Sequence, residues 1–364
     1  MQDQPYHDAA ETVIRAGNIP FPVNETLINI LKTIMTSEEA RFVTHFHKPL
    51  NRDEIKATSG FEDAALDAML ESLMDNGVLS GIPSQHTGVP VYRPMPPIPG
   101  IFETTMMRGE TGEKQKTLAR LFEKLFEEFS AMVQANYDAI APAFAAIPPM
   151  TRIIPVEAQA DDTVDTILPL EEVKKLVARF DTIGVAACYC RHQKDLLDRP
   201  CQVTDERKNC LFFGKTARFF IDHKFAEPIS RQEALKILEK AEKDGLVHKA
   251  FHEKYDTGRD EMAICNCCKC CCETFQIFYR GGGPAVTYTA YIATVDKDAC
   301  VGCEACIDIC PMEAVRMIDD IAQVDEARCI GCGVCAGHCD AGAITRSVDR
   351  SAGGVCVMPE KRVA

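Results

Sequence analysis

Apolar residues recur at helical spacing in the first part of the chain, separated by short polar breaks. Asn24 is placed to cap a helix over residues 25–35, and Ser37 and Asn51 stand where two further helices would begin. Residues 61–75 carry the clearest pattern, with an apolar face opposite an acidic one. The apolar face comprises Phe61, Ala65, Leu66, Met69, Leu70 and Leu73. A succession of short helices is therefore predicted before residue 76.

Beyond these helices the apolar pattern changes to that of strands. Asn76 and Gly77 would stop the last helix, and the apolar runs at residues 78–79 and 89–92 predict a β-hairpin. Three helices followed by a hairpin are typical of a winged helix-turn-helix, so we predict a winged-helix-like module over residues 1–95. An irregular lead-in is expected at its start, up to about residue 22.

Residues 96–150 are expected to contain a linker and a long helix. Prolines are frequent from Pro94 to Pro99, which is typical of a linker. Residues 118–140 then repeat apolar side chains at helical spacing until Pro142 interrupts the run. This pattern predicts one long core or interface helix.

Residues 151–284 mix strand and helix patterns. Strands are predicted at 152–156 and 183–190, and a helix at 170–179. Ser230 begins a capping box that opens another helix. The mixture predicts a cysteine-rich α/β middle domain.

A duplicated cysteine run dominates the C-terminal part of the chain. Each copy has the spacing C-x2-C-x2-C-x3-C, and the second copy follows the first at a constant offset of 29 residues. The first copy comprises Cys300, Cys303, Cys306 and Cys310, and the second Cys329, Cys332, Cys335 and Cys339. A [4Fe–4S] cube needs four thiolates, and three closely spaced cysteines can wrap it while a remote cysteine closes the fourth corner.

This region, taken as residues 285–350, resembles the bacterial-type two-cluster ferredoxin domain. In two-cluster proteins the fourth cysteine of each run ligates the other cluster. Cluster one would then use Cys300, Cys303, Cys306 and Cys339, and cluster two Cys329, Cys332, Cys335 and Cys310. The usual proline after the last cysteine is present at Pro311 but is replaced by Asp340 in the second copy. Paired zinc sites are the competing interpretation, although zinc motifs do not usually carry a third cysteine at this spacing.

Ten more cysteines lie upstream of the repeat. They are Cys188, Cys190, Cys201, Cys210, Cys265, Cys267, Cys268, Cys270, Cys271 and Cys272. Six fall within eight residues, and adjacent thiolates repel one another unless a cation or a cluster neutralises them. We expect at least one further [4Fe–4S] cluster here. Zinc ligation and unligated thiols remain open, and spacing does not show which cysteines share a centre.

Other polar residues near these cysteines are secondary candidates. His192, His248 and His252 could act as ligands, but surface or capping roles are the simpler expectation. Arg191 and Lys269 could offset cluster charge or simply be solvated.

The order of the motifs over residues 183–345 is similar to that of a group of ferredoxin-type iron–sulfur proteins of anaerobic bacteria. The shared motifs are Cys-x-Cys-Arg at 188–191 and Ile-Cys-Asn-Cys-Cys-x-Cys-Cys-Cys at 264–272. The resemblance implies electron transfer in an anaerobe and names no partner.

Composition places the chain among globular proteins with an unusual cysteine content. Its 364 residues predict two to four domains, here with a short tail at 351–364, and 46% hydrophobic and 26% charged residues are ordinary values. It has 19 cysteines, and we see neither a signal peptide nor an apolar run long enough to span a membrane. Reduced thiols in the cytoplasm are therefore expected rather than disulfides.

The net charge of −14 argues against nucleic-acid binding, which depends on Lys and Arg at the phosphates. Residues 1–100 carry seven Lys and Arg against thirteen Asp and Glu, and the predicted helix at 61–75 has no basic residue. Such a helix would be repelled from a phosphate groove. An acidic protein suits a basic docking partner instead.

Together these patterns predict an α+β multidomain protein that passes single electrons through iron–sulfur clusters. Redox partner proteins or a larger oxidoreductase complex would be its partners, and it would be a component rather than a stand-alone enzyme. The alternatives are a redox-sensing regulator that uses the winged-helix module, and an enzyme with a catalytic cluster in the middle domain.

Overall fold

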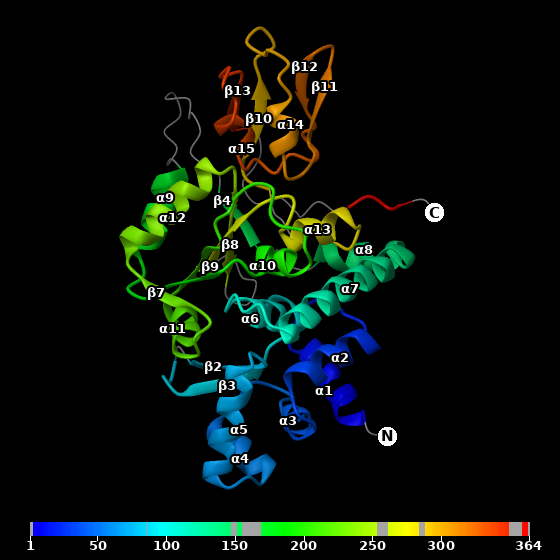
Figure 1. Cartoon of the computed structure of the whole chain (residues 1–364), viewed down its shortest axis with the longest axis vertical. Helices are drawn as coiled ribbons and strands as arrows, with labels where there is room; N and C mark the ends of the chain where they lie inside the picture. The colour runs from blue at the N-terminus through cyan, green and yellow to red at the C-terminus, as the bar shows by residue number, and fades with distance from the viewer. Residues whose placement is uncertain are drawn as a thin grey trace. The chain divides into compact units, whose positions relative to one another are not determined.

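The computed structural model describes residues 3–84, 86–146, 151–154, 169–252, 261–283, 288–348 and 359–362 (Figure 1). The chain divides into two compact units, each assembled from several segments. The first unit draws on residues 1–129, 186–200 and 215–228, and the second on 130–185, 201–214 and 229–364. The boundaries of the five consecutive parts named above remain predictions.

The first unit is mainly helical. Its helices are α1 (Gln4–Arg15), α2 (Glu25–Ile34), α3 (Ser37–Val43), α4 (Arg52–Ser59), α5 (Asp63–Asp75), α6 (Phe102–Met106), most of α7 (Glu113–Ala135), α10 (Tyr189–Leu196) and most of α11 (Gly214–Asp222). A single irregular turn, η1 (Pro97–Ile101), precedes α6. The strands β1 (Leu50–Asn51), β2 (Leu79–Pro83) and β3 (Pro90–Pro94) form an antiparallel sheet in the order β1–β3–β2.

Side-chain caps set the helix starts in this unit. The Asn24 side chain accepts a hydrogen bond from the Leu27 N–H at 2.9 Å and begins α2. Asn51 begins α4 through a capping box, and Gly60 ends it with a φ of +71°. These two starts, the beginning of α3 at Ser37 and the hairpin β2–β3 confirm the sequence-based expectations, and Thr36 provides the cap of α3.

The expectation of an irregular lead-in was wrong, because residues 4–15 form α1. Ala9, Ala10 and Val13 are fully buried there at helical spacing, and α1 contacts α2 and α3. Two of these residues are alanines, which give only a weak apolar signal in the sequence. Burial of this small face holds the helix in place.

The proline-rich stretch is packed rather than loose, because Ile98 and Ile101 are buried in the core. Phe102, which follows, lies 5.1 Å from Phe122 and 5.0 Å from Phe126 between ring centroids. These contacts join α6 to α7 in one aromatic core.

The single helix expected over 118–140 is instead two helices. The first, α7, ends at Ala135, and α8 (Tyr137–Ala146) begins after a break at Asn136. Pro142 lies inside α8 and does not end it. Pro142 is the sixth residue of α8, beyond the first four N–H groups that have no partner within a helix, so it removes one backbone hydrogen bond without ending α8.

The second unit is built around a six-stranded sheet in the order β4–β8–β9–β6–β5–β7. The strands of this sheet are β4 (Thr151–Ile154), β5 (Ile183–Ala187), β6 (Lys208–Phe213), β7 (Glu227–Ile229), β8 (Val247–His252) and β9 (Glu261–Cys267); the last two residues of β5 and the first two of β7 are counted with the first unit. Helices α9 (Pro169–Ala178) and α12 (Arg231–Lys243) contact each other and share a core with the sheet. Val173, Leu238, Leu211 and Ile264 are fully buried in that core.

The apolar strand expected over 183–190 is shorter than predicted. It ends at Ala187, where Cys188 becomes the N-cap residue of α10, so Cys190 lies in the first turn of a helix. Tyr189 and Cys190 are buried, which explains why the apolar run continued past the strand.

The C-terminal part of this unit repeats one structural pattern twice. It contains α13 (Glu273–Tyr279), β10 (Tyr291–Val295), α14 (Ala305–Ile309), β11 (Val315–Ile318), β12 (Ile321–Val324), α15 (Val334–Gly337) and β13 (Ile344–Val348). β10 pairs with β13, and β11 with β12, both antiparallel. At the offset of 29 residues, β10 corresponds to β12, α14 to α15 and β11 to β13. The described elements thus define an α+β protein with a ferredoxin-like C-terminal domain.

Candidate metal centres

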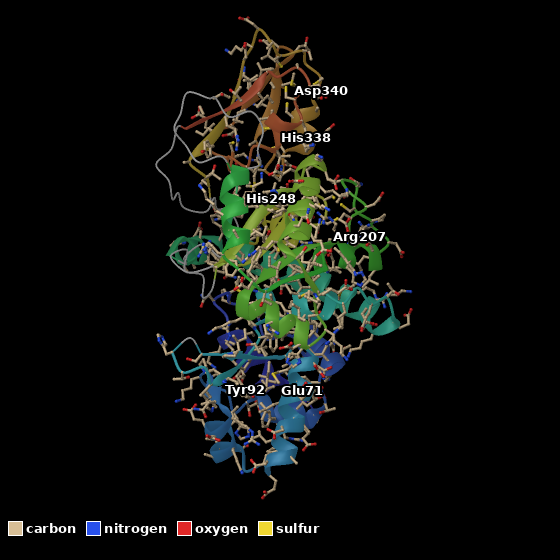
Figure 2. The ribbon with its side chains drawn as sticks, turned by 90° about the vertical axis from the view of Figure 1, so that its left-hand side faces the viewer. Glu71, Tyr92, Arg207, His248, His338 and Asp340 are labelled. Carbon is tan, nitrogen blue, oxygen red and sulfur yellow. The ribbon has the colours of Figure 1, made fainter. Side chains whose placement is uncertain are left out.

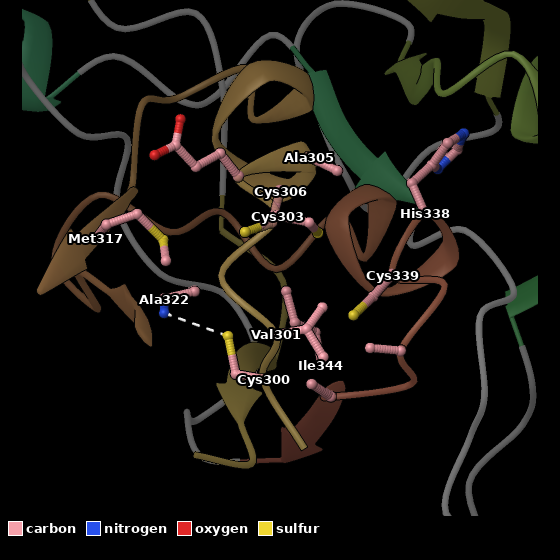
Figure 3. Close-up of a pocket in the computed structure, with 13 residues that line it drawn as sticks. Cys300, Val301, Cys303, Ala305, Cys306, Met317, Ala322, His338, Cys339 and Ile344 are labelled. Atoms are coloured by element: carbon pink, nitrogen blue, oxygen red, sulfur yellow. Dashed lines mark hydrogen bonds between the residues drawn. The ribbon is translucent and has the colours of Figure 1, made fainter. Parts of the chain in front are cut away.

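The first cysteine pocket of the C-terminal domain is lined by residues from both copies of the repeat (Figure 3). Cys300, Cys303 and Cys306 come from the first copy, and Cys339 comes from the end of the second. The short helix α14 carries Cys306, and Cys339 follows α15. The crossed set of four that cluster one requires therefore surrounds one pocket.

The second pocket shows the reverse exchange. It is lined by Cys329, Cys332 and Cys335 from the second copy and by Cys310 from the first. All four of these thiols are buried, whereas in the first pocket Cys303 is exposed. The two pockets thus differ in their access to water.

Backbone N–H groups point at two of these sulfurs. The Ala322 N–H donates to Cys300 Sγ at 3.5 Å (Figure 3). The Ala314 N–H donates to Cys310 Sγ at 3.3 Å. The first bond lowers the pKa of Cys300, because it stabilises the thiolate. Such N–H···S bonds are also among the factors that set the potential of a cluster.

Burial acts in the opposite direction in the second pocket. Desolvation raises the pKa of Cys332 to about 12, and it raises the pKa of Cys335 well above its ordinary value. Thiolates in so dry a place need positive charge beside them, and the irons of a cluster would provide it. Four converging sulfurs, N–H donors and a dry wall all fit a [4Fe–4S] cluster.

Glycine is required in the loop of the second cysteine run, between Cys329 and Cys332. Gly331 has a φ of +69°, and a Cβ there would lie 2.2 Å from the Tyr291 carbonyl oxygen. No side chain fits without moving the backbone. Its counterpart Gly302 has a φ of +71°, and a Cβ there would lie 2.9 Å from the Asp320 carbonyl oxygen.

Asp340, the residue that replaces proline in the second copy, is exposed directly after Cys339 (Figure 2). His338, two residues earlier, is half-buried, and its ring contacts the Val334 carbonyl at 3.0 Å. A carboxylate at this position adds negative charge beside the first pocket only.

Four of the middle cysteines converge in a group that we call the thiol quartet: Cys201, Cys268, Cys270 and Cys271. Their sulfur atoms all lie within 4.8 Å of one another. Cys201 lies in the loop between α10 and β6, and the other three lie in the turn between β9 and α13. Hydrogen bonds from Cys268, Cys270 and Cys271 lower the pKa of Cys201, whereas hydrogen bonds within the same group raise the pKa of Cys271.

The remaining middle cysteines lie outside the quartet. Cys265 and Cys267 are on β9 with the same strand parity, and Cys272 precedes α13. The pKa of Cys267 is raised, chiefly by its hydrogen bond with Cys272 and to a smaller extent by burial. Cys188, Cys190 and Cys210 are buried, and Cys356 lies outside the described residues.

One charged residue near Cys267 escaped the sequence analysis. Lys249 of β8 is fully buried and bonded to the Thr274 hydroxyl, and its charge partly opposes the rise in the pKa of Cys267. The sequence does contain a signal for it: Lys249 lies on the same face of its strand as Val247 and Phe251, where an apolar residue would be expected.

The surface roles expected for the three histidines were wrong, because all three are buried. His192 Nε2 lies 2.7 Å from the Glu110 carbonyl oxygen, and His248 Nδ1 lies 2.6 Å from Asn266 Oδ1. These hydrogen bonds explain the burial of their rings. His252 is 3% exposed.

The expectation of solvated charges near the cysteines also failed in part. Arg191 is fully buried in α10, while Lys269 is half-buried beside the quartet. The expectation of a solvated side chain is therefore wrong for Arg191.

Comparison with known families agrees with the geometry of the repeat. Residues 292–340 are similar to the family described as the 4Fe-4S dicluster domain, and they include all eight cysteines of the duplicated run. No curated protein and no solved structure matches the chain. This similarity and the two cysteine-lined pockets support an iron–sulfur protein, in which residues 292–340 resemble a [4Fe–4S] dicluster domain.

Among the helices that the structure describes, none combines the length and the apolar character needed to cross a bilayer.

Proposed function

We propose that this protein transfers single electrons between a donor and a partner oxidoreductase through the two clusters of its C-terminal domain. The observation that carries the proposal is the crossed lining of the two cysteine pockets. Cys306 lines one pocket and Cys310 the other, only four residues later, so the two centres are close neighbours. A [4Fe–4S] cluster accepts and releases one electron, and the chain's cysteines hold two of them within one domain.

The first pocket suits exchange with a partner. Cys303 is exposed, and Val301, which also lines the pocket, is 72% exposed. An apolar side chain at the rim of an acidic protein allows close, weak docking of a redox partner. The buried second pocket would exchange electrons through the first.

The test is mediated electron transfer by the full-length protein under anaerobic conditions. A chemical reductant and an excess of cytochrome c are mixed with catalytic amounts of the protein, and cytochrome reduction is followed by its absorbance. The wild type should accelerate the reaction, and Cys303→Ser should slow it at least several-fold. A wild type that reduces and reoxidises without accelerating the transfer would argue against a carrier role.

A further cluster in the middle region remains part of the proposal. Cys265, Cys267 and Cys272 are buried outside the quartet, and Lys249 offsets negative charge at Cys267. Buried thiols beside a buried cation suit an anionic centre. The prediction is more than roughly eight irons per chain after anaerobic purification, since two [4Fe–4S] clusters hold that number.

We also propose that the N-terminal part is a winged-helix-like module that docks a protein. Its support is the succession α2 to α5 followed by the hairpin β2–β3, to which β1, from just before α4, adds a third strand. Asp63 and Asp67 of α5 already pair with Arg52, at 2.9 and 2.7 Å, which leaves that basic residue engaged. A basic face on a partner would suit the acidic helix.

The element order of this module is also the observation that favours the second candidate function, a redox-sensing regulator. Measuring the retardation of duplex DNA in a gel at low salt separates the two functions. The acidic face of α5 predicts no retardation in either the oxidised or the reduced state. A salt-dependent shift that changes with oxidation state would favour the regulator.

A further inference from the structure

The sulfur atoms of the thiol quartet are unusually close together. Cys201 Sγ lies 3.6 Å from Cys268 Sγ and 3.7 Å from Cys270 Sγ. Cys270 Sγ lies 3.6 Å from Cys268 Sγ and 3.5 Å from Cys271 Sγ. All six sulfur–sulfur separations are below 4.8 Å. The four sulfurs therefore converge on a space of atomic size.

This spacing matches a single metal ion. Four thiolates held at about 2.3 Å from one tetrahedral ion lie roughly 3.8 Å apart. In a [4Fe–4S] cube each thiolate binds a different iron, so its four sulfurs must stand around the whole cube. The quartet is too tight for that arrangement.

The surroundings hold the four thiols in place. Gln276 Nε2 donates to the carbonyl of Lys269, which lies between Cys268 and Cys270, at 2.7 Å. The turn is closed by a bond from the Cys272 N–H to the Cys268 carbonyl at 3.1 Å. Hydrogen bonds that orient metal ligands in this way are typical of built metal sites.

Apolar packing seals the inner side of the group. Cys268 and Cys271 are 3% and 1% exposed and pack with Ala241 and Leu246, which are themselves buried. Four sulfur ligands and a closed apolar wall leave no coordination position for a substrate. These features characterise a structural site.

We propose that Cys201, Cys268, Cys270 and Cys271 bind one Zn²⁺ ion, which fastens the loop after α10 to the turn before α13. Zinc suits four thiolates in a closed tetrahedral site and undergoes no redox change. The ion joins segments that are 67 residues apart in the chain. The middle cysteines thus divide between a structural zinc site and thiols that are available for other centres.

Zinc analysis of the full-length protein tests the proposal. The wild type, purified anaerobically from medium that contains iron and zinc, should hold about one zinc per chain. Its zinc X-ray absorption should show four sulfur neighbours at about 2.3 Å. Cys201→Ser should lose at least nine-tenths of the zinc and keep the iron of the dicluster domain.

The matched control is Cys272→Ser, which changes a neighbouring cysteine outside the quartet and places a good capping residue before α13. It should keep its zinc. If Cys201→Ser does not fold, the absorption spectrum of the wild type decides alone. A wild type without zinc, nitrogen or oxygen neighbours around the zinc, or a folded Cys201→Ser that keeps its zinc would overturn the proposal.

Discussion

Cys310 lines the same pocket as Cys332, although it belongs to the other cysteine run along the chain. Cys339 makes the reverse exchange and lies with Cys306 in the first pocket. Neither copy of the repeat therefore surrounds a pocket by itself. The crossing binds the two copies into one domain and brings two centres close together.

Replacing Cys310, which belongs to the first cysteine run, should disturb the second pocket. In Cys310→Ser the second cluster loses its fourth thiolate, so about half of the dicluster iron should become labile. Iron content and electron paramagnetic resonance of the reduced protein measure the effect. Cys339→Ser should remove the other signal, so a loss of the same signal from both variants would refute the crossed assignment.

Alanine at Gly331 should destabilise the second pocket far more than alanine at Gly342. Both positions have a positive φ, but a Cβ at Gly331 meets Thr289 Oγ1 at 2.0 Å, and nothing lies within 4 Å of one at Gly342. We expect a cost of about 1–2 kcal/mol at Gly342, from the left-handed backbone alone. The cost at Gly331 should exceed about 3 kcal/mol. The decay of cluster absorbance in denaturant compares them, and equal losses would contradict the steric argument.

Asp340→Asn should raise the potential of one cluster more than that of the other. The carboxylate follows Cys339, and negative charge favours the oxidised state of a nearby cluster. Because Asp340 is exposed, the shift should be on the order of 20 mV. A redox titration followed by paramagnetic resonance supplies both potentials, and the second cluster serves as the internal control. Equal shifts would count against placing Asp340 at cluster one.

Stability should fall as the pH rises towards 8 because of one buried carboxyl group in α6. Burial raises the pKa of Glu103 to about 7, although the Gly100 N–H, at 2.5 Å, opposes this. The folded state binds the proton more tightly, so the stabilisation is complete below about pH 4.5 and is lost as the pH rises through about 7. Glu103→Gln removes this loss, which is on the order of 3 kcal/mol.

Urea unfolding followed by circular dichroism at pH 5.5 and pH 8 measures this difference. The advantage of Glu103→Gln over the wild type should grow with pH. Glu113→Gln, at an exposed position on α7, controls for the removal of one negative charge. A constant difference between wild type and Glu103→Gln at both pH values would exclude this role of Glu103.

The parts of the fold that follow from local rules could be predicted from the sequence. Asn24 and Asn51 cap helices because their side chains satisfy free N–H groups, which depends only on neighbouring residues. The offset of 29 residues likewise predicted an internal duplication, which the structure shows as two strand–helix–strand copies. By contrast, α1 depends on packing of the alanines Ala9 and Ala10 against other helices, and this is not visible locally.

The grouping of the middle cysteines could not be predicted for the same reason. Cys270 and Cys271 are adjacent, and both belong to the quartet, whereas Cys272 does not. Which of these cysteines join the quartet depends on how the backbone turns between β9 and α13. It also depends on the position of Cys201, which lies in a loop far away in the sequence. The burial of His248 also depends on a tertiary partner, Asn266 of β9.

The most direct test of the account is an anaerobic redox titration of the full-length protein, followed by paramagnetic resonance and paired with iron and sulfide analysis. The account predicts two [4Fe–4S] signals that appear on one-electron reduction, with at least roughly eight irons and as many sulfides per chain. Absence of acid-labile sulfide, with zinc in place of iron at the eight repeat cysteines, would contradict it.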